Sequence, residues 1–380
     1  MKRLKISLSP LDTFFFRDGK PFSSGEQSEA EGIFPPFSST AYGALRTEYI
    51  SEHGMTAFTS GKLEKTIGTI ESVKNASFRI KGIFLADESH TYFSLPRDIV
   101  QTKIVHSKKC DHLYHLYLSE RSKIFSNAPL TSLLMCDNQN EKVEYPSNSF
   151  MDENDMNAYL LDCSVPHECM KQDDFLKREP KIGIGRNAET LTSKEGLLYR
   201  LDMMRFYNKN GKFQLCVEAS GISLNNQGIL KLGGENKAFV YESAEAESPL
   251  DSDEFKAELA ERLEQKRQNG KIRFKLCFAT PAIGDTGWRI KKIFSSGISC
   301  NLITAAIGKY LNIGGWDLVK REPKRMYRAV PAGSVYYCET ESEKTTAKDV
   351  IDAFHYQNIS DQRSEEGFGL VLVGAIQEEV

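Results

Sequence analysis

The stretch from residue 10 to residue 46 constrains the fold of this chain more than any other. It begins with an aromatic run, passes through a loop rich in Ser, Glu and Gly, and then reaches Pro35-Pro36. The next residues, Ser38-Ser39-Thr40, predict the start of a helix, because hydroxyl side chains can accept hydrogen bonds from the first free N–H groups. The residues alone therefore indicate a strand, loop and helix connection, with the aromatic run in the core.

The same stretch has the features of an anion site. A helix N-terminus presents free N–H groups, a glycine allows close approach, and arginine supplies charge. Aromatics such as Phe14, Phe16 and Trp288 could stack on unpaired bases, although we expect most of them to be core residues.

Composition and charge limit the classes of protein. The chain has 380 residues, 40% of them hydrophobic, which is enough for two medium domains with real cores. The net charge of −3 argues against a uniformly basic protein, yet residues 177–205 hold seven Lys and Arg against four acids, and residues 317–328 hold five against two. These basic segments indicate either a confined RNA path or a solvated surface.

No apolar run could span a bilayer and the first residues lack a signal-peptide core, so we expect a cytoplasmic protein with no membrane contact.

The eight cysteines form no C-x-x-C pair, which favours free and largely buried thiols. Two clusters have the chemistry of zinc ligands without a standard spacing, and the sequence leaves zinc binding open: Cys110, His112 and His115, and Cys163, His167 and Cys169.

Periodicity and turn residues place the main elements. We expect a strand over residues 4–8, a helix over 39–51 that stops at Gly54, and a strand over 78–85. Residues 92–100 predict a strand that Pro96 ends, as at the edge of a sheet. Residues 101–175 are polar and irregular and are assigned as an insertion without a function.

A hairpin is predicted over residues 174–206, with its tip in residues 181–196. The G-x-G-x-x-A motif at residues 183–188 is not a dinucleotide fingerprint, because no buried strand precedes it and no helix follows. A last strand with a Gly-Gly bend is expected over residues 230–240. A solvated helix follows over 248–268, and a second β-rich unit starts at 271.

Several long motifs carry a family resemblance. The N-terminal pattern P-L-D-T-x-F-F-R-D-G-x-P-F continues into P-P-x-S-S-T-x-x-G-A-L-R. R-A-V-P-A-G-S-V-Y-Y follows at residues 328–337, and G-F-G at 367–369. The chain resembles RAMP-superfamily subunits of the type III-B CRISPR effector, the Cmr complex, and in particular the family of third subunits that holds the 5′ handle of the guide RNA. The resemblance covers most of the chain outside 101–175. In the G-G-W-D motif at residues 314–317, Gly314 stands where the family usually has Ser.

This resemblance implies an α+β fold with two ferredoxin-like (RRM-like) domains, a protruding β-hairpin thumb and a C-terminal glycine-rich loop. The expected domains are 1–247, with the insertion at about 101–175 and the thumb at about 181–196, and 248–380.

It also implies a non-catalytic ribonucleoprotein subunit in antiviral defence, without a cofactor. The expected partners are the crRNA through its 5′ handle, the large cyclase/polymerase-like Cmr subunit, the backbone RAMP subunit and, indirectly, the target RNA. The expected RNA-binding residues are Arg17, Lys20, Ser38, Ser39, Thr40, Gly43, Arg46, Arg186, Asn187, Thr190, Lys194, Trp288, Arg325, Arg328, Gly367, Phe368 and Gly369.

Two enzyme classes are alternatives. Some RAMP relatives are metal-independent endoribonucleases that process guide RNA, which needs a general acid and base, most often histidine. His53 and His355 are the histidines near family-like segments, and neither has an evident partner in the sequence. A nucleotide-dependent enzyme is disfavoured, because the sequence has neither a P-loop nor the acidic pair of a polymerase palm.

Overall fold

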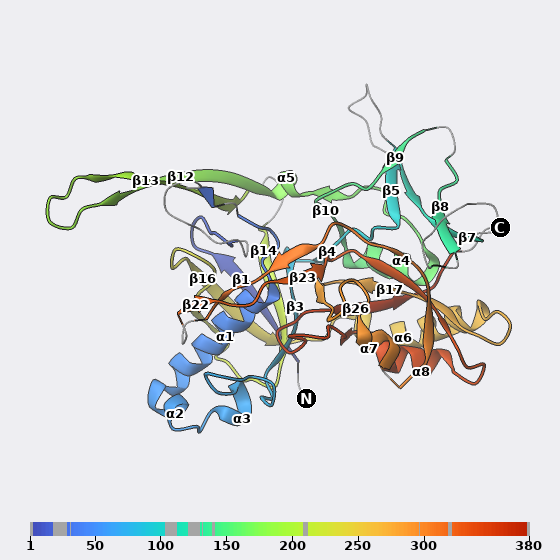
Figure 1. Ribbon diagram of the computed structural model, residues 1–380. Coiled ribbons are helices and arrows are strands. Elements are labelled where there is room, and N and C mark those ends of the chain that lie inside the picture. The colour runs from blue at the N-terminus through green and yellow to red at the C-terminus, as the bar shows by residue number, and fades with distance from the viewer. Residues whose placement is uncertain are drawn as a thin grey trace. The chain divides into compact units, whose positions relative to one another are not determined.

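The computed structural model describes residues 3–17, 29–30, 32–102, 112–120, 130, 132–138, 141–207, 212–295, 297–317 and 321–377. The fold is mixed α and β, and most of its strands lie in antiparallel sheets (Figure 1). The chain divides into two compact units. Unit 1 comprises Met1–Ser89, Asp173–Ala246 and Asn312–Arg328, and unit 2 comprises His90–Gln172, Glu247–Leu311 and Ala329–Val380. The expected domain boundary at 247/248 stays a prediction.

The elements of unit 1 are β1 (Arg3–Pro10), β2 (Glu29–Ala30), α1 (Ser38–His53), α2 (Met55–Thr59), α3 (Glu64–Ile67), β3 (Arg79–Ala86), β12 (Leu176–Arg186), β13 (Ser193–Phe206), β14 (Gln214–Ser220), β15 (Gln227–Lys231), β16 (Ala238–Glu245), β21 (Trp316–Asp317) and β22 (Glu322–Pro323). The elements α5 (Gln172–Phe175), β20 (Leu311–Ile313) and β23 (Tyr327–Val330) lie where the chain passes from one unit to the other.

Five strands of unit 1 pair in the order β3-β14-β1-β16-β15, each neighbour antiparallel. The alternation predicted for residues 4–8 is confirmed, since Ile6 and Leu8 are buried. The single strand expected over 230–240 is wrong: β15 and β16 form a hairpin there. Its turn needs Gly233, which has φ +82° and whose Cβ would lie 2.5 Å from the carbonyl oxygen of Phe15.

The aromatic run of the N-terminal stretch lies in the core. Phe14, Phe15 and Phe16 are each at most 3% exposed. The Phe14 ring packs on Phe206 and Phe239, with centroids 4.9 and 5.8 Å apart. These phenylalanines therefore stabilise the sheet and its connections rather than stack on a base.

Helix α1 begins and ends close to the predicted residues, and Gly54 ends it, with its N–H donating to the Ile50 carbonyl. The predicted cap is wrong, however. The N-cap residue is Phe37, no side chain caps the helix, and Ser38 is 2% exposed. Ser38, Ser39 and Thr40 lie in the first helical turn itself, whereas a capping hydroxyl belongs to the residue before that turn, which here is Phe37.

The predicted hairpin forms from β12 and β13, which pair from Leu176↔Phe206 to Ile184↔Leu198 (Figure 1, green). Its base is anchored, because the N–H and C=O of Phe14 both pair with Met204 and β2 pairs with Leu201. Its end is a turn in which the Asn187 side chain accepts hydrogen bonds from the N–H groups of Glu189 and Thr190. The residues Asn-Lys-Asn-Gly at 208–211 also predict a turn from the sequence, and they lie outside the described residues.

The elements of unit 2 are β4 (Thr91–Ser94), β5 (Ile99–Thr102), β6 (Leu113–His115), β7 (Tyr117–Glu120), β8 (Ser132–Met135), β9 (Val143–Glu144), β10 (Ser149–Asp152), α4 (Glu153–Asp162), β11 (Met170–Lys171), the 3₁₀ helix η2 (Pro249–Asp251), α6 (Asp253–Gln265), β17 (Arg273–Phe278), β18 (Ala282–Ile283), α7 (Lys291–Ser295), β19 (Cys300–Ala306), β24 (Val335–Thr340), α8 (Ala347–Phe354), β25 (Gln357–Asn358) and β26 (Leu370–Gly374).

The main sheet of unit 2 has the antiparallel order β19-β24-β17-β26-β25. Helix α6 presents Phe255, Leu259 and Leu263 to the core, as the spacing of four predicts, and Ser252 caps its start. The helix is shorter than expected, because Pro249–Asp251 forms a separate 3₁₀ turn.

A cluster of polar side chains is buried within unit 2. The Asp98 carboxylate is fully buried and accepts hydrogen bonds from the hydroxyls of Tyr159 and Tyr337, each at 2.7 Å. The His115 Nε2 atom lies 3.3 Å from both Asp98 Oδ2 and the Nζ atom of Lys275, which is itself fully buried. The Lys275 ammonium also lies 3.3 Å from the centroid of the Tyr159 ring.

The cluster sets the ionisation of its members. Burial acts to raise the pKa of Asp98, but the charges of Lys275 and His115 and the donated hydrogen bonds hold that pKa well below its usual value. Burial and the charge of Lys275 lower the pKa of His115. The stable arrangement is therefore an ionised carboxylate that compensates a buried ammonium.

We expect Asp98→Asn to lower the free energy of unfolding by about 3–5 kcal/mol, because it leaves Lys275 as an uncompensated buried charge. Chemical denaturation measures this cost. Asp162→Asn is the matched control: its carboxylate is 52% exposed and pairs with Arg262, so its loss should cost about 0–1 kcal/mol.

The double variant Asp98→Asn/Lys275→Met should be less destabilised than Asp98→Asn alone, since the buried charge is removed with its partner. Equal costs for the Asp98 and Asp162 variants would contradict this account of the core.

Candidate functional site

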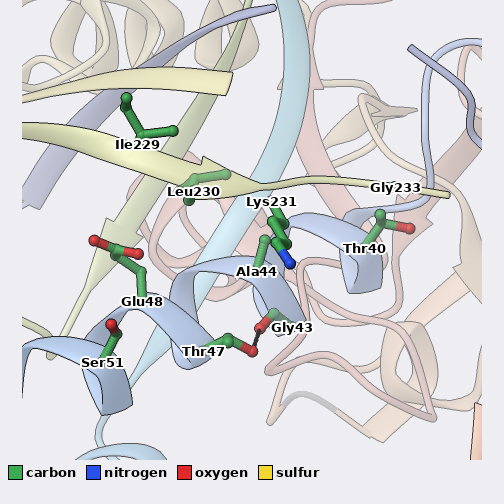
Figure 2. Close-up of a pocket in the computed structure, with 10 residues that line it drawn as sticks. All are labelled: Thr40, Gly43, Ala44, Thr47, Glu48, Ser51, Ile229, Leu230, Lys231 and Gly233. Carbon is green, nitrogen blue, oxygen red and sulfur yellow. Dashed lines mark hydrogen bonds between the residues drawn. The ribbon is translucent and has the colours of Figure 1, made fainter. Parts of the chain in front are cut away.

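A groove in unit 1 runs between helix α1 and strand β15 (Figure 2). Its volume is about 530 Å³, within the range of small-ligand sites. Six residues of α1 form one wall, and their spacing of three and four places them on one helix face: Thr40, Gly43, Ala44, Thr47, Glu48 and Ser51. The other wall is formed by Ile229, Leu230, Lys231 and Gly233.

The groove is lined by polar and apolar groups in similar measure and carries both signs of charge. Figure 2 shows Lys231 between Gly233 and Leu230, opposite the α1 wall, and Glu48 toward the end where Ser51 lies. The Tyr241 hydroxyl is 2.9 Å from Glu52 and 3.5 Å from Glu48. Burial, and then the neighbouring Glu52, raise the pKa of Glu48. The ammonium, the hydroxyls and the exposed backbone at Gly43 are groups that can contact a phosphate and sugar chain.

Gly43 is the unusual residue of the groove. It lies inside a helix, where glycine is less stable than alanine by roughly 0.5–1 kcal/mol. Its conformation does not require glycine, and a Cβ atom there would have no heavy atom within 4 Å. The missing side chain therefore leaves open the part of the helix that faces the groove.

The structure brings two of the expected N-terminal residues, Thr40 and Gly43, to this groove. Arg46 faces elsewhere: its Nε and Nη2 atoms donate to the carbonyls of Ile67 and Thr69 at 2.9 and 2.5 Å. These bonds tie α1 to the end of α3 and to the segment after it. Ser38 is buried, Ser39 is half-buried, and Arg17 is exposed and forms a backbone bridge with Gly32. Lys20 lies outside the described residues.

The remaining expected residues fall in three places. Arg186, Asn187, Thr190 and Lys194 lie together at the hairpin end, where only Asn187 is partly buried. Arg325 and Arg328 are exposed in unit 1, and Trp288 is 37% exposed in unit 2. Gly367, Phe368 and Gly369 are buried in unit 2.

The glycine-rich loop is held by internal hydrogen bonds. The hydroxyl of Thr280 donates to the Gly367 carbonyl and accepts from the Leu370 N–H, both at 2.8 Å. The Gly369 N–H donates to the Pro281 carbonyl at 2.8 Å, and the Phe368 side chain is fully buried. The loop therefore has a structural role within unit 2, and its contact with RNA stays a prediction.

Sequence reasoning missed Lys231, Thr47, Glu48 and Ser51. Thr47 and Ser51 follow Gly43 at helical spacing, so the helix face could have been extended from the sequence. Lys231 lies almost two hundred residues away on β15, and no local pattern connects it with α1.

The two histidines considered for catalysis have structural contacts. His355 is 2% exposed: its Nδ1 lies 3.1 Å from the Val373 N–H, and its Nε2 lies 2.6 Å from the Leu250 carbonyl. His53 stacks on Tyr49, and its Nδ1 lies 2.9 Å from the Tyr49 carbonyl. His115 faces Asp98, but this pair is buried with Lys275 in the core.

No three His, Cys, Asp or Glu side chains of the described part of the chain form a group that could hold a metal ion. Cys110 lies outside that part, while Cys163 is buried and its thiol lies 3.2 Å from the Ala375 carbonyl. None of the helices in the described ranges is both long enough and apolar enough to cross a membrane.

A family model for CRISPR-associated proteins, Cas_Cmr3, matches residues 6–376. The chain belongs to the Cas_Cmr3 family. The match confirms the resemblance on which the expected RNA-binding residues rest, and it extends across residues 101–175. A comparison with curated proteins gave no match.

The chain is also similar to chains of solved effector complexes. One is from a type III-B Cmr-beta complex bound to cognate target RNA, with 17% identity over 88% of this chain and 86% of that chain and a TM-score of 0.49. A second is from the same kind of complex with target RNA and AMPPnP, with 16% identity over 92% and 88% and a TM-score of 0.48. A third is from a type III-A Csm3-Csm4 subcomplex, with 12% identity over 88% and 92% and a TM-score of 0.36. The family assignment rests on the family match alone.

We expect Gly43→Ala to raise the free energy of unfolding by about 0.5–1 kcal/mol, because the added methyl group meets open space and alanine favours the helix. Chemical denaturation provides the measurement. Gly228→Ala is the control in the same unit: its Cβ would lie 2.5 Å from the Tyr241 ring, so we expect a loss of stability. A loss at both positions would show that Gly43 is required by the fold.

Proposed function

We propose that this protein is the non-catalytic crRNA-binding subunit of a type III-B CRISPR effector, in which it anchors the 5′ handle of the guide RNA. The observation that carries the proposal is the family match over residues 6–376. Its partners are the large cyclase/polymerase-like subunit and the backbone RAMP subunit, and target RNA is bound indirectly. The two-domain ferredoxin-like architecture belongs to the same proposal.

The α1–β15 groove is the first element of the RNA path in this proposal. Its Lys231 supplies charge for phosphate, and its hydroxyls supply hydrogen bonds to the sugar and phosphate chain. Gly43 lets the RNA backbone approach the helix. The polar part of the groove supports a backbone contact that fixes the position of the RNA without selecting bases.

The β12–β13 hairpin is the second element, and we propose that it is the thumb. Beyond the anchored base, its strands pair only with each other among the described residues. Ile182, Ile184, Leu191 and Leu198 are all more than half exposed, together with the polar residues of the turn. Such a segment buries too little surface to be fixed by the unit alone, so we propose that it is ordered against the guide RNA.

The endoribonuclease alternative has less support. The imidazole nitrogens of His355 are both engaged in the core, and His53 stacks on its own helix. Incubation of the purified protein with RNA in the absence of metal tests the alternative directly, and cleavage under these conditions would favour it.

The test of the function is affinity purification of the tagged full chain from its host. We expect the other effector subunits and a small RNA with a constant 5′ end to co-purify. Gly43→Leu, whose side chain would project into the groove, should retain the protein partners and recover less RNA. A monodisperse protein without subunits or RNA would show that the proposed function is wrong.

Removal of residues 187–192 and closure by a two-residue turn should leave the melting temperature of the protein nearly unchanged, because residues 188–192 are all exposed. In the assembled complex we expect the deletion to change ribonuclease protection of the guide next to the handle. Replacement of the exposed Lys181 by Gln is a milder control, since it keeps the hairpin intact. An identical footprint with and without the turn would remove the hairpin from the RNA path.

A further inference from the structure

Arg97 of unit 2 is fixed by several contacts, and it belongs to neither the α1–β15 groove nor the β12–β13 hairpin. Its backbone N–H donates to the Gly333 carbonyl at 2.8 Å. The next residue, Asp98, is fixed in the core by the hydroxyls of Tyr159 and Tyr337. The backbone at residue 97 is therefore fixed by its own N–H group and by the next residue, independently of the Arg97 side chain.

The guanidinium of Arg97 lies between an aromatic ring and a glycine. Its Cζ atom is 4.3 Å from the centroid of the Tyr145 ring. The Tyr145 hydroxyl donates to the Leu95 carbonyl at 2.7 Å, and burial raises the pKa of Tyr145 to about 12, so the ring stays a neutral donor. On Gly308, a Cβ atom would lie 2.2 Å from Arg97 Cζ. Glycine at 308 thus leaves the space that the guanidinium fills.

This cation has no counter-charge in the described part of the chain. None of the described residues forms an ion pair with Arg97, and its Nε atom is buried without an acceptor. The adjacent Asp98 is not available, because its carboxylate faces Lys275 and His115. A half-buried guanidinium without a counter-charge is costly for the free chain, and an anion at its accessible nitrogen atoms would supply that charge.

The surroundings favour a nucleic-acid phosphate as this anion. Lys309 and Tyr310 follow Gly308 directly, both are exposed, and Tyr310 is 46% accessible. Arginine, lysine and tyrosine side by side are typical of surfaces that bind single-stranded RNA. A planar guanidinium already held on a ring loses little freedom when its fork binds two phosphate oxygens.

We propose that Arg97, held by Tyr145 and Gly308, binds a backbone phosphate of single-stranded RNA. The proposal rests on the proposed RNA-binding function and adds to it a contact in unit 2, in a segment for which the family resemblance gave no RNA-binding residue.

The test uses the full chain and a short fluorescein-labelled oligoadenylate RNA, with binding measured over a series of salt concentrations. Arg97→Gln should weaken binding about tenfold, the scale of a lost charge-assisted hydrogen bond. It should also reduce the slope of log affinity against log salt by about 0.7, the value for one phosphate contact on a single strand. Arg97→Lys, which keeps the charge but not the fork, should fall between Arg97→Gln and the wild type.

Two further variants distinguish an effect of the Arg97 site from an effect of net charge and from a failure to fold. Arg262→Gln makes the same change in net charge at an arginine already paired with Asp162 and Glu258, and we expect no effect on RNA binding. Gly308→Ala keeps every charge and displaces the guanidinium, so it should reproduce the loss seen with Arg97→Gln. If Arg97→Gln does not fold, Gly308→Ala decides the result.

The outcomes distinguish the two proposals. If the wild type does not bind RNA at all, alone or with co-purified subunits, the proposed function fails and this site fails with it. If the wild type binds RNA and Arg97→Gln and Gly308→Ala match its affinity and salt slope, only the Arg97 site is overturned. If these variants bind RNA normally but lose a protein subunit on purification, the anion is a carboxylate of that subunit, which also overturns the RNA proposal.

Discussion

The buried Asp98 carboxylate is the interaction on which the organisation of unit 2 depends. It joins five segments that are distant in the sequence, through Tyr159, Tyr337, His115 and Lys275. Each partner contributes to keeping the carboxylate ionised, and the carboxylate in turn compensates the buried ammonium of Lys275. A charge network of this kind adds little net stability compared with an apolar core, but its geometry allows few alternatives, because any shift leaves a charge without a partner.

The same anchor fixes the neighbouring Arg97. Residues 97 and 98 are consecutive, yet one side chain is satisfied within the core and the other has no acceptor for its buried Nε. The carboxylate next to Arg97 therefore compensates Lys275, contacts His115 and leaves the Arg97 guanidinium without a counter-charge among the described residues. This asymmetry is the physical basis for assigning an external anion to Arg97.

Unit 1 is organised by apolar contacts instead. The phenylalanines at 14 and 16 lie beside Phe239 and Phe206 and hold the N-terminal segment to the sheet and to the hairpin base. Helix α1 buries Ala41, Tyr42 and Leu45 on one face and lines the groove with another. Gly43 lies on the face of α1 that lines the groove, so it removes no core contact. The cost of this glycine to stability is therefore limited to its lower helix propensity.

The sequence by itself determined the local elements and the family. The strand at residues 4–8, the helix that ends at Gly54 and the hairpin at 176–206 follow from periodicity and turn residues, which depend on neighbours in the chain. The tertiary structure decided the rest. The predicted Ser cap does not form, because Phe37 occupies the N-cap position, and Arg46 is directed to the carbonyls of Ile67 and Thr69. The groove forms because Lys231 lies on the strand that faces the helix with Gly43. The Arg97 side chain and backbone are positioned by residues 145, 308 and 333, which come from separate parts of the chain. Spacing along a chain records which residues share a helix or strand face, whereas these contacts join segments separated by many tens of residues, and only the packing of the folded units fixes which of them meet.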